Sequence, residues 1–275
     1  MIQSILLAVD ASENSKVAAT YANYLAYKLD AVIDAVYVMD ARLINTPYWT
    51  DYGAVSLPVA RFSEEMRQIL ESQGEVVLKS VRENAEQAGV RCRTEIRSGI
   101  PALEILEAAK DCDLIVIGRH GETSKLEKAR RLGGVSERVL RSSRHPVLVA
   151  SLDFQEIERV LLCFDGSDRA REAMTYAVEL AKRLKLPVQA ISVYDDEEVA
   201  NEQLEVVRNY AEAHQLDVTL VAKEGDPGEA ILETAQTGDL IAMGAFGEGR
   251  IREWLLGSTT ESVLRSAVQP LLMHR

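Results

Sequence analysis

Residues 5–12 read ILLAVDAS, and the same pattern returns at residues 160–167 as VLLCFDGS. Each copy is an apolar run that ends in Asp, a small residue and Ser. Two later landmarks also recur in the same order. GIP at 99–101 matches GDP at 225–227, and VLRSS at 139–143 matches VLRSA at 263–267. Repetition of several landmarks in a fixed order predicts that the chain is a tandem duplication.

Apolar runs of strand length alternate with helical patterns in both halves. The runs cover 4–9, 32–38, 91–97, 113–118 and 146–150, and then 158–164, 187–193, 217–223, 239–244 and 269–273. Many are near-continuous Val, Ile and Leu, which is typical of parallel strands buried on both faces. Helices are expected at Ser15–Lys28, at Arg169–Leu184 and at Glu197–His214, and Ser12 and Ser167 are candidate caps for the first two. The pattern predicts an α/β fold with doubly wound parallel sheets.

The two copies join near Ser151 to Glu156, which predicts one domain at residues 1–153 and another at 154–275. The first copy carries an inserted segment at about 41–70. We expect this segment to be a long surface loop that leads into a helix from about Ser63. It is either a packed excursion or a lid or partner surface that uses Tyr48 and Trp49.

The second half contains a glycine-rich segment with Gly244, Gly247 and Gly257, followed at once by Ser258. Gly244 ends an apolar strand, and Ser258 opens a helix that ends near Ser266. Glycines let the backbone approach an anion closely, and the amide groups at a helix start attract negative charge. Asp165, at the end of the first strand of this half, can accept hydrogen bonds from a ribose hydroxyl or reach a metal; the alternative is an ordinary turn and helix cap, since Asp-Gly-Ser is common in turns. These features predict a nucleotide site at the carboxyl ends of the strands.

The first half departs from this spacing. Gly118, Arg119, His120 and Gly121 are followed by eleven residues and then by Gly133 and Gly134, so glycine stands where the second half has Ser258. The intervening loop is basic, with Arg119, Lys125, Lys128, Arg130 and Arg131. This loop either holds phosphates with its side chains or is a relic of a lost site. His120 is the one histidine with a candidate ligand role, whereas His145 and His274 are expected to be structural.

The whole chain resembles a tandem universal stress protein of the UspA-like family. The resemblance rests on VDAS (9–12), FDGS (164–167), the two Gly-x-Pro landmarks and, above all, the family's ATP signature Gly-x2-Gly-x9-Gly-Ser/Thr, which Gly244 to Ser258 match in full. It implies two five-stranded sheets of strand order 3-2-1-4-5, of the adenine-nucleotide-binding type. It also implies binding of ATP, with Mg²⁺, mainly in the second domain.

Carried over by position, the family's ATP contacts in the second domain are Cys163, Asp165, Val193, Met243, Gly244, Gly247, Gly257, Ser258 and Thr259. The corresponding candidates in the first domain are Ala8, Asp10, Val38, Ile117, Gly118, Gly121, Gly133, Gly134 and Val135. Single-domain members of the family often dimerise through their last strands. We therefore expect 145–150 and 269–273 to pair within one chain as a pseudo-twofold unit, and further homodimerisation is left open.

The net charge and the cysteine content argue against several kinds of partner and site. The net charge of -12 disfavours nucleic acid and anionic membranes as partners, and three scattered cysteines indicate a reducing, cytoplasmic setting without disulfides or zinc. The acidic stretch 195–205 is either a solvated face or a patch for a basic partner.

The chain lacks a P-loop, a nucleophile elbow and a zinc-protease motif, so catalysis beyond slow ATP hydrolysis is not expected. The expected function is a nucleotide-binding stress-response or signalling module with an unknown protein partner; the alternative is a scaffold that binds no nucleotide.

Overall fold

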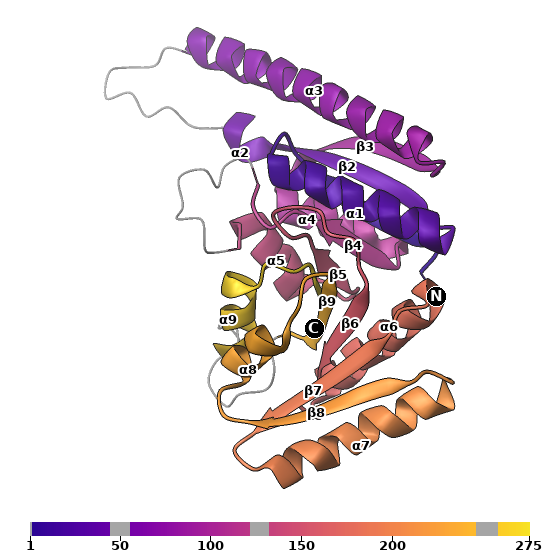
Figure 1. Ribbon diagram of the computed structural model, residues 1–275. Coiled ribbons are helices and arrows are strands. Elements are labelled where there is room, and N and C mark those ends of the chain that lie inside the picture. Colours follow the sequence, from indigo (N-terminus) through magenta and orange to yellow (C-terminus); the bar gives the residue numbers. More distant parts are fainter. Residues whose placement is uncertain (1, 45–55, 122–131, 246–257) are drawn as a thin grey trace.

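The structure is a computed structural model that describes residues 2–44, 56–121, 132–245 and 258–275, and from residue 56 to 62 it describes only the backbone. Strands and helices alternate in both halves (Figure 1). The first half contains β1 (Ser4–Val9), α1 (Glu13–Leu29), β2 (Val32–Asp40), α2 (Ala41–Ile44), α3 (Ser56–Gln87), β3 (Cys92–Gly99), α4 (Pro101–Ala108), the 3₁₀ turn η1 (Ala109–Asp111), β4 (Leu114–Ile117), α5 (Gly134–Ser142) and β5 (Val147–Val149). The second half contains β6 (Arg159–Cys163), α6 (Asp168–Leu184), β7 (Val188–Tyr194), α7 (Glu197–Ala213), β8 (Val218–Glu224), α8 (Pro227–Thr234), β9 (Asp239–Gly244), α9 (Ser258–Ser266) and β10 (Leu271–His274).

All ten of these strands join one sheet, in the order β3-β2-β1-β4-β5-β10-β9-β6-β7-β8. Counted within each half, this is the order 3-2-1-4-5, which confirms the predicted doubly wound fold. Every neighbouring pair within a half is parallel. Parallel pairing requires crossover connections, and among these the sequence pattern predicted the helices that became α1, α6, α7 and α9.

The two halves meet at a seam between β5 and β10, which pair antiparallel with Leu271 opposite Val149 and Met273 opposite Val147. This confirms the expected pairing of the two last strands within one chain, and it hides two edges that would otherwise be open. Because the seam is antiparallel, the strands of the two halves run in opposite directions. The carboxyl ends of the first half's strands therefore lie beside the amino end of β10.

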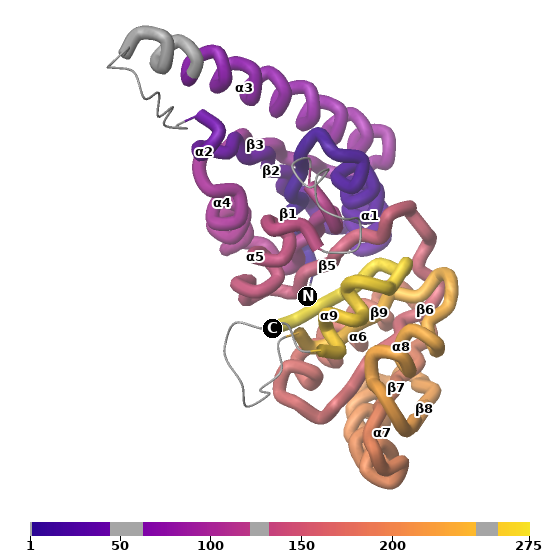
Figure 2. The backbone as a smooth tube through the Cα atoms, turned by 90° about the vertical axis from the view of Figure 1, so that its left-hand side faces the viewer, coloured from indigo at the N-terminus to yellow at the C-terminus, as the bar shows by residue number. Residues whose placement is uncertain are grey.

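Side chains alternate between two apolar layers. In β1, Ile5, Leu7 and Val9 pack on the side of α1, α3, α6 and α7, whereas Leu6 and Ala8 pack on the side of α4, α5, α8 and α9. Each layer runs across the seam without a break, since both contain buried residues of both halves. Figure 2 shows the result as a long molecule, with α3 and α7 at opposite ends.

The corresponding helices α1 and α6 start and stop in the same way. Ser12 caps α1 by accepting a hydrogen bond from the amide of Ser15 at 3.2 Å, and Ser167 caps α6 by accepting one from Ala170 at 3.1 Å. Both helices end at a left-handed residue, Asp30 and Lys185. The predicted serine caps are confirmed, and the duplication extends to local backbone geometry.

The inserted segment differs from the long surface loop expected at 41–70. Helix α2 follows β2 directly at Ala41, and α3 begins at Ser56, not at about Ser63. Pro58 suggested a loop, but it falls in the first turn of α3, where a proline removes no intrahelical hydrogen bond. Tyr48 and Trp49 lie outside the described residues, so their role as a lid or partner surface stays a prediction.

Candidate functional site

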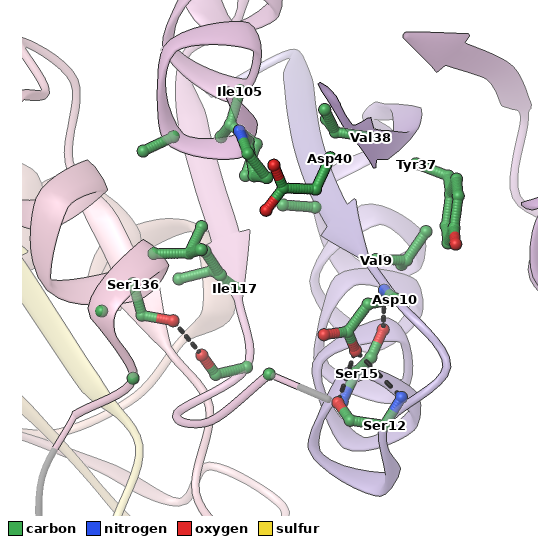
Figure 3. Close-up of a pocket in the computed structure, with 18 of the residues that line it drawn as sticks. Val9, Asp10, Ser12, Ser15, Tyr37, Val38, Asp40, Ile105, Ile117 and Ser136 are labelled. Carbon is green, nitrogen blue, oxygen red and sulfur yellow. Dashed lines mark hydrogen bonds between the residues drawn. The ribbon is translucent and has the colours of Figure 1, made fainter. Parts of the chain in front are cut away.

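A cavity of about 480 Å³ opens at the carboxyl ends of β1, β2 and β4, between α4 and α5 (Figure 3). This is the position at which doubly wound sheets bind their ligands, and the volume is in the ordinary range of small-molecule sites. All nine residues proposed for the first half line this one cavity. They are Ala8, Asp10, Val38, Ile117, Gly118, Gly121, Gly133, Gly134 and Val135.

Asp10 stands at the end of β1 in a fixed orientation. Its Oδ1 accepts hydrogen bonds from the amide of Ser12 at 2.9 Å and from the Ser12 hydroxyl at 2.5 Å. The Asp10 amide donates to the Ser15 hydroxyl at 3.0 Å, and Figure 3 shows these side chains gathered at the start of α1. The cap of α1 thus also orients the carboxylate that faces the cavity.

Two backbone segments that line the cavity, one with Gly118 and Gly121 and the other with Gly133 and Gly134, lie close together and form what we call the cradle. The Gly133 amide donates to the Arg119 carbonyl at 2.9 Å, and the buried Ser136 hydroxyl donates to the Gly118 carbonyl at 2.8 Å. A β-carbon on Gly121 would lie 2.8 Å from Oδ2 of Asp10, so a side chain there would displace the carboxylate. Helix α5 begins at Gly134, and the free amide groups of its first turn suit an anion.

Several polar lining residues were missed by the sequence analysis. Asp40 ends β2, and its Oδ2 lies 2.6 Å from the Arg42 guanidinium, whose hydrogen bonds hold the pKa of that carboxyl below its usual value. Arg42 and Arg138 also line the cavity. Two features of the sequence point to these residues. Asp40 ends a central strand as Asp10 does, and Arg138 lies one helical turn after Gly134.

His120 lines the same cavity, which agrees with its selection as a candidate ligand residue. Burial lowers the pKa of its imidazole, and the neighbouring Arg119 charge lowers it further. A neutral imidazole contributes hydrogen bonding but no charge. The cationic groups that an anionic ligand would meet in the described part of this cavity are therefore Arg42 and Arg138.

The side chain of Arg119 is not available to a phosphate in the first cavity, although the basic loop was one candidate for holding phosphates with its side chains. The Arg119 side chain turns away from the cavity and is only 5% exposed. Its guanidinium donates to the carbonyl of Ala267 at 2.6 Å and to that of Gln269 at 3.3 Å, both in the second half. A buried guanidinium needs acceptors, and the carbonyls at the end of α9 supply them. Lys125, Lys128, Arg130 and Arg131 lie outside the described residues.

The described part of the second site repeats this arrangement. Oδ1 of Asp165 accepts from the Ser167 amide at 3.1 Å and from its hydroxyl at 2.6 Å, as Asp10 does with Ser12. Gly244 ends β9 so close to α6 that a β-carbon on it would lie 2.8 Å from the amide of Ala170. Ser258 and Thr259 open α9. Gly247 and Gly257 lie outside the described residues.

The three apolar residues proposed for the second site lie on neighbouring strands. Cys163 pairs with Met243 across β6 and β9, and Val193 is near the end of the adjacent β7. All three are buried in the layer of α8 and α9. Burial raises the pKa of the Cys163 thiol, so it is a neutral, small apolar group there. The structure therefore brings these three candidates together in one buried layer near the carboxyl ends of β6, β7 and β9.

The described residues contain no group of three or more His, Cys, Asp or Glu side chains that could hold a metal ion. None of the described helices combines the length and apolar character needed to cross a membrane.

The continuous sheet and the repeated Asp, glycine and helix-start arrangement define a tandem α/β protein with a ligand cavity at a carboxyl edge. The model of the Universal stress protein family matches residues 1–151 and again residues 156–275. The chain therefore belongs to the universal stress protein family and carries two copies of its domain.

Similar proteins cover the chain from end to end. Universal stress protein Slr1230 of Synechocystis sp. is 30% identical over 292 residues, with 100% of both chains covered. A solved universal stress protein from Archaeoglobus fulgidus is 25% identical, covers 99% of this chain and 98% of its own, and has a TM-score of 0.78. A solved universal stress protein in complex with cAMP matches 55% of this chain and 99% of its own, at 22% identity and a TM-score of 0.40.

Proposed function

We propose that this tandem universal stress protein binds ATP and acts as a stress-response or signalling module in the cytoplasm. One observation carries the proposal. A cavity of about 480 Å³ joins a fixed carboxylate, a glycine cradle and a helix start at the carboxyl edge of the sheet. An apolar wall, a ribose acceptor and a backbone anion site are the three parts that a nucleotide needs.

In the first half, each residue's proposed role follows from its place in the cavity wall. Ala8, Val38 and Ile117 contact the base, Asp10 accepts from the ribose hydroxyls, and the cradle from Gly118 to Val135 holds phosphates. The cradle fits this use because a β-carbon at Gly121 would occupy the space beside Asp10. Arg42 and Arg138 lie close enough to add positive charge to the same cavity.

The second half is proposed as the main ATP site. It has the complete glycine spacing, and Ser258 offers a hydroxyl at the helix start where the first half has Gly134. Mg²⁺ would be held by the phosphates, since the described part of the chain offers no ready set of metal ligands. Because the sequence contains no P-loop, nucleophile elbow or zinc-protease motif, we propose slow hydrolysis at most.

Thermal unfolding with ligand tests this function. ATP with Mg²⁺ at about 100 times Kd should stabilise the folded state by about 2.7 kcal/mol. At roughly 2–4 °C per kcal/mol, Tm should rise by several degrees. Adenosine, which lacks the phosphates, should raise Tm less. An unchanged Tm at millimolar ATP would instead favour a scaffold that acts through protein contacts alone.

A further inference from the structure

Arg119 contacts both halves of the molecule, the first through its main chain and the second through its side chain. Its main chain is part of the first cradle, because its carbonyl accepts from the Gly133 amide at 2.9 Å and its neighbours Gly118 and Gly121 line the cavity. Its side chain crosses the seam and donates to the carbonyls of Ala267 and Gln269. A movement of the cradle backbone at Arg119 therefore moves the guanidinium that is bonded to the second half.

The far end of this contact is the end of α9. Ala267 follows the last residue of α9 and is buried, as is Gln269 before β10. A cation at this position satisfies carbonyls at the helix end and interacts favourably with the helix dipole. The same helix begins at Ser258, the proposed phosphate contact of the second site. Helix α9, with nine residues and a length of roughly 14 Å, thus links Arg119 to that site.

The matching position of the second half makes no such contact, because its residue is alanine. Ala245 occupies the position in the second half that Arg119 occupies in the first, directly after the glycine that ends the fourth strand. Its methyl side chain cannot donate across the seam. Instead, its amide donates to the His274 carbonyl at 2.6 Å, within the second half. The crossing guanidinium is therefore a feature that the duplication itself does not require.

We propose that Arg119 couples the two nucleotide sites, so that a nucleotide in the first cavity strengthens ATP binding in the second. This inference rests on the proposed function. A ligand that hydrogen-bonds to the first cradle fixes the Arg119 backbone, and the guanidinium then fixes the end of α9. With its far end held, α9 keeps Ser258 in position for the phosphates of the second nucleotide, which gives positive cooperativity. The coupling is reciprocal by thermodynamic linkage.

Titration calorimetry of ATP with Mg²⁺ into the full chain tests the coupling as a double-mutant cycle. Gly121→Val closes the first site. With Arg119 present, we expect this closure to weaken ATP binding at the second site by about fivefold or more. In the Arg119→Met background, closing the first site should change the second Kd by less than about twofold, because the link is already lost.

Two further variants separate coupling from simple disturbance of the seam. Arg183 of α6 also crosses between the halves, donating to the carbonyls of Ile2 (2.6 Å) and Leu29, and none of these three residues lines the first cavity. Arg183→Met should leave the coupling intact. Arg119→Lys keeps the charge without the planar fork that reaches two carbonyls, so it should lose most of the coupling while the chain stays folded.

The outcomes are distinct. Two bound ATP molecules and a second Kd that is the same in wild type and Gly121→Val would overturn the coupling while the proposed function stands. Binding of a single ATP to wild type would also overturn it. The coupling is assigned to the wrong residue if closure of the first site still weakens the second in Arg119→Lys and Arg119→Met. Absence of ATP binding in every folded variant would overturn both the function and the coupling.

Discussion

At the scale of single residues, Gly121 and Gly134 make a matched pair. A β-carbon on Gly121 would meet Oδ2 of Asp10 at 2.8 Å, whereas one on Gly134 would meet nothing within 4 Å. Gly121→Val should therefore remove ATP binding from the first site and reduce the number of bound nucleotides by one. Gly134→Ala should change neither the stoichiometry nor, by more than about 0.5 kcal/mol, the stability. Equal effects of the two changes in calorimetry would show that the cradle does not approach a ligand.

The hydroxyl at the helix start is a second residue-scale difference. Ser258→Ala should weaken ATP binding at the second site several-fold, since a hydrogen bond contributes about 0.5–1.5 kcal/mol. Gly134→Ser should strengthen the first site by a similar factor, because it adds the hydroxyl that the first copy lacks. The same titrations measure both Kd values. A tighter site after Ser258→Ala would contradict the phosphate role of that hydroxyl.

The glycine motif of the second half can be tested by Gly247→Val. This substitution places a β-branched side chain in the complete glycine motif, so it should abolish ATP binding at the main site, whereas Gly121→Val removes the weaker first site and leaves ATP bound, though less tightly, at the second. The tighter of the two binding events in a titration should disappear in Gly247→Val and persist in Gly121→Val. The reverse result would make the first half the principal site.

At the scale of elements, the start of α1 serves both stability and the site. Ser12 caps the helix and holds Oδ1 of Asp10 through its hydroxyl. Ser12→Ala should destabilise the protein by about 1 kcal/mol, lower Tm by a few degrees and weaken binding at the first site. Ser12→Thr keeps the hydroxyl and should retain most of the stability. Identical Tm values for wild type and Ser12→Ala would show that the cap contributes nothing.

At the scale of the whole molecule, His274 lies near the seam at the end of β10. Its ring stacks on Tyr176 with centroids 5.0 Å apart, and its Nδ1 lies 2.8 Å from the Glu172 carboxylate. Burial lowers the pKa of His274, and this outweighs the opposite effect of Glu172. Between the folded pKa and the usual value of about 6.5, the unfolded chain binds more protons than the folded one. Stability is therefore greatest above this window and is lost as the pH falls through it.

Urea unfolding at several pH values between about 7.5 and 5 measures this effect. The free energy of unfolding of the wild type should fall as the solution is acidified. His274→Gln, which cannot take up the proton, should show a shallower decline over the same window. Parallel declines in the two proteins would mean that His274 does not contribute to the acid sensitivity of the seam.

The sequence by itself determined the fold. Ten apolar runs, several of them near-continuous Val, Ile and Leu, indicated parallel strands, and the serine caps at Ser12 and Ser167 specified where α1 and α6 begin. Both signals are local, because strand burial and helix capping depend on residues that are close in the chain. The repeat could also be read from the sequence, and the family resemblance carried over by position named nine first-half candidates that all line one cavity in the structure.

Only the tertiary structure decided how Arg119 is used. Its place in a basic glycine-rich loop suggested a phosphate ligand, but its guanidinium bonds to carbonyls about 150 positions further along the chain. The antiparallel seam brings the carboxyl edge of the first half against the end of α9, and a buried cation takes the nearest free acceptors. The direction of a long side chain depends on what packs beside it, and here that neighbour comes from the other half of the molecule.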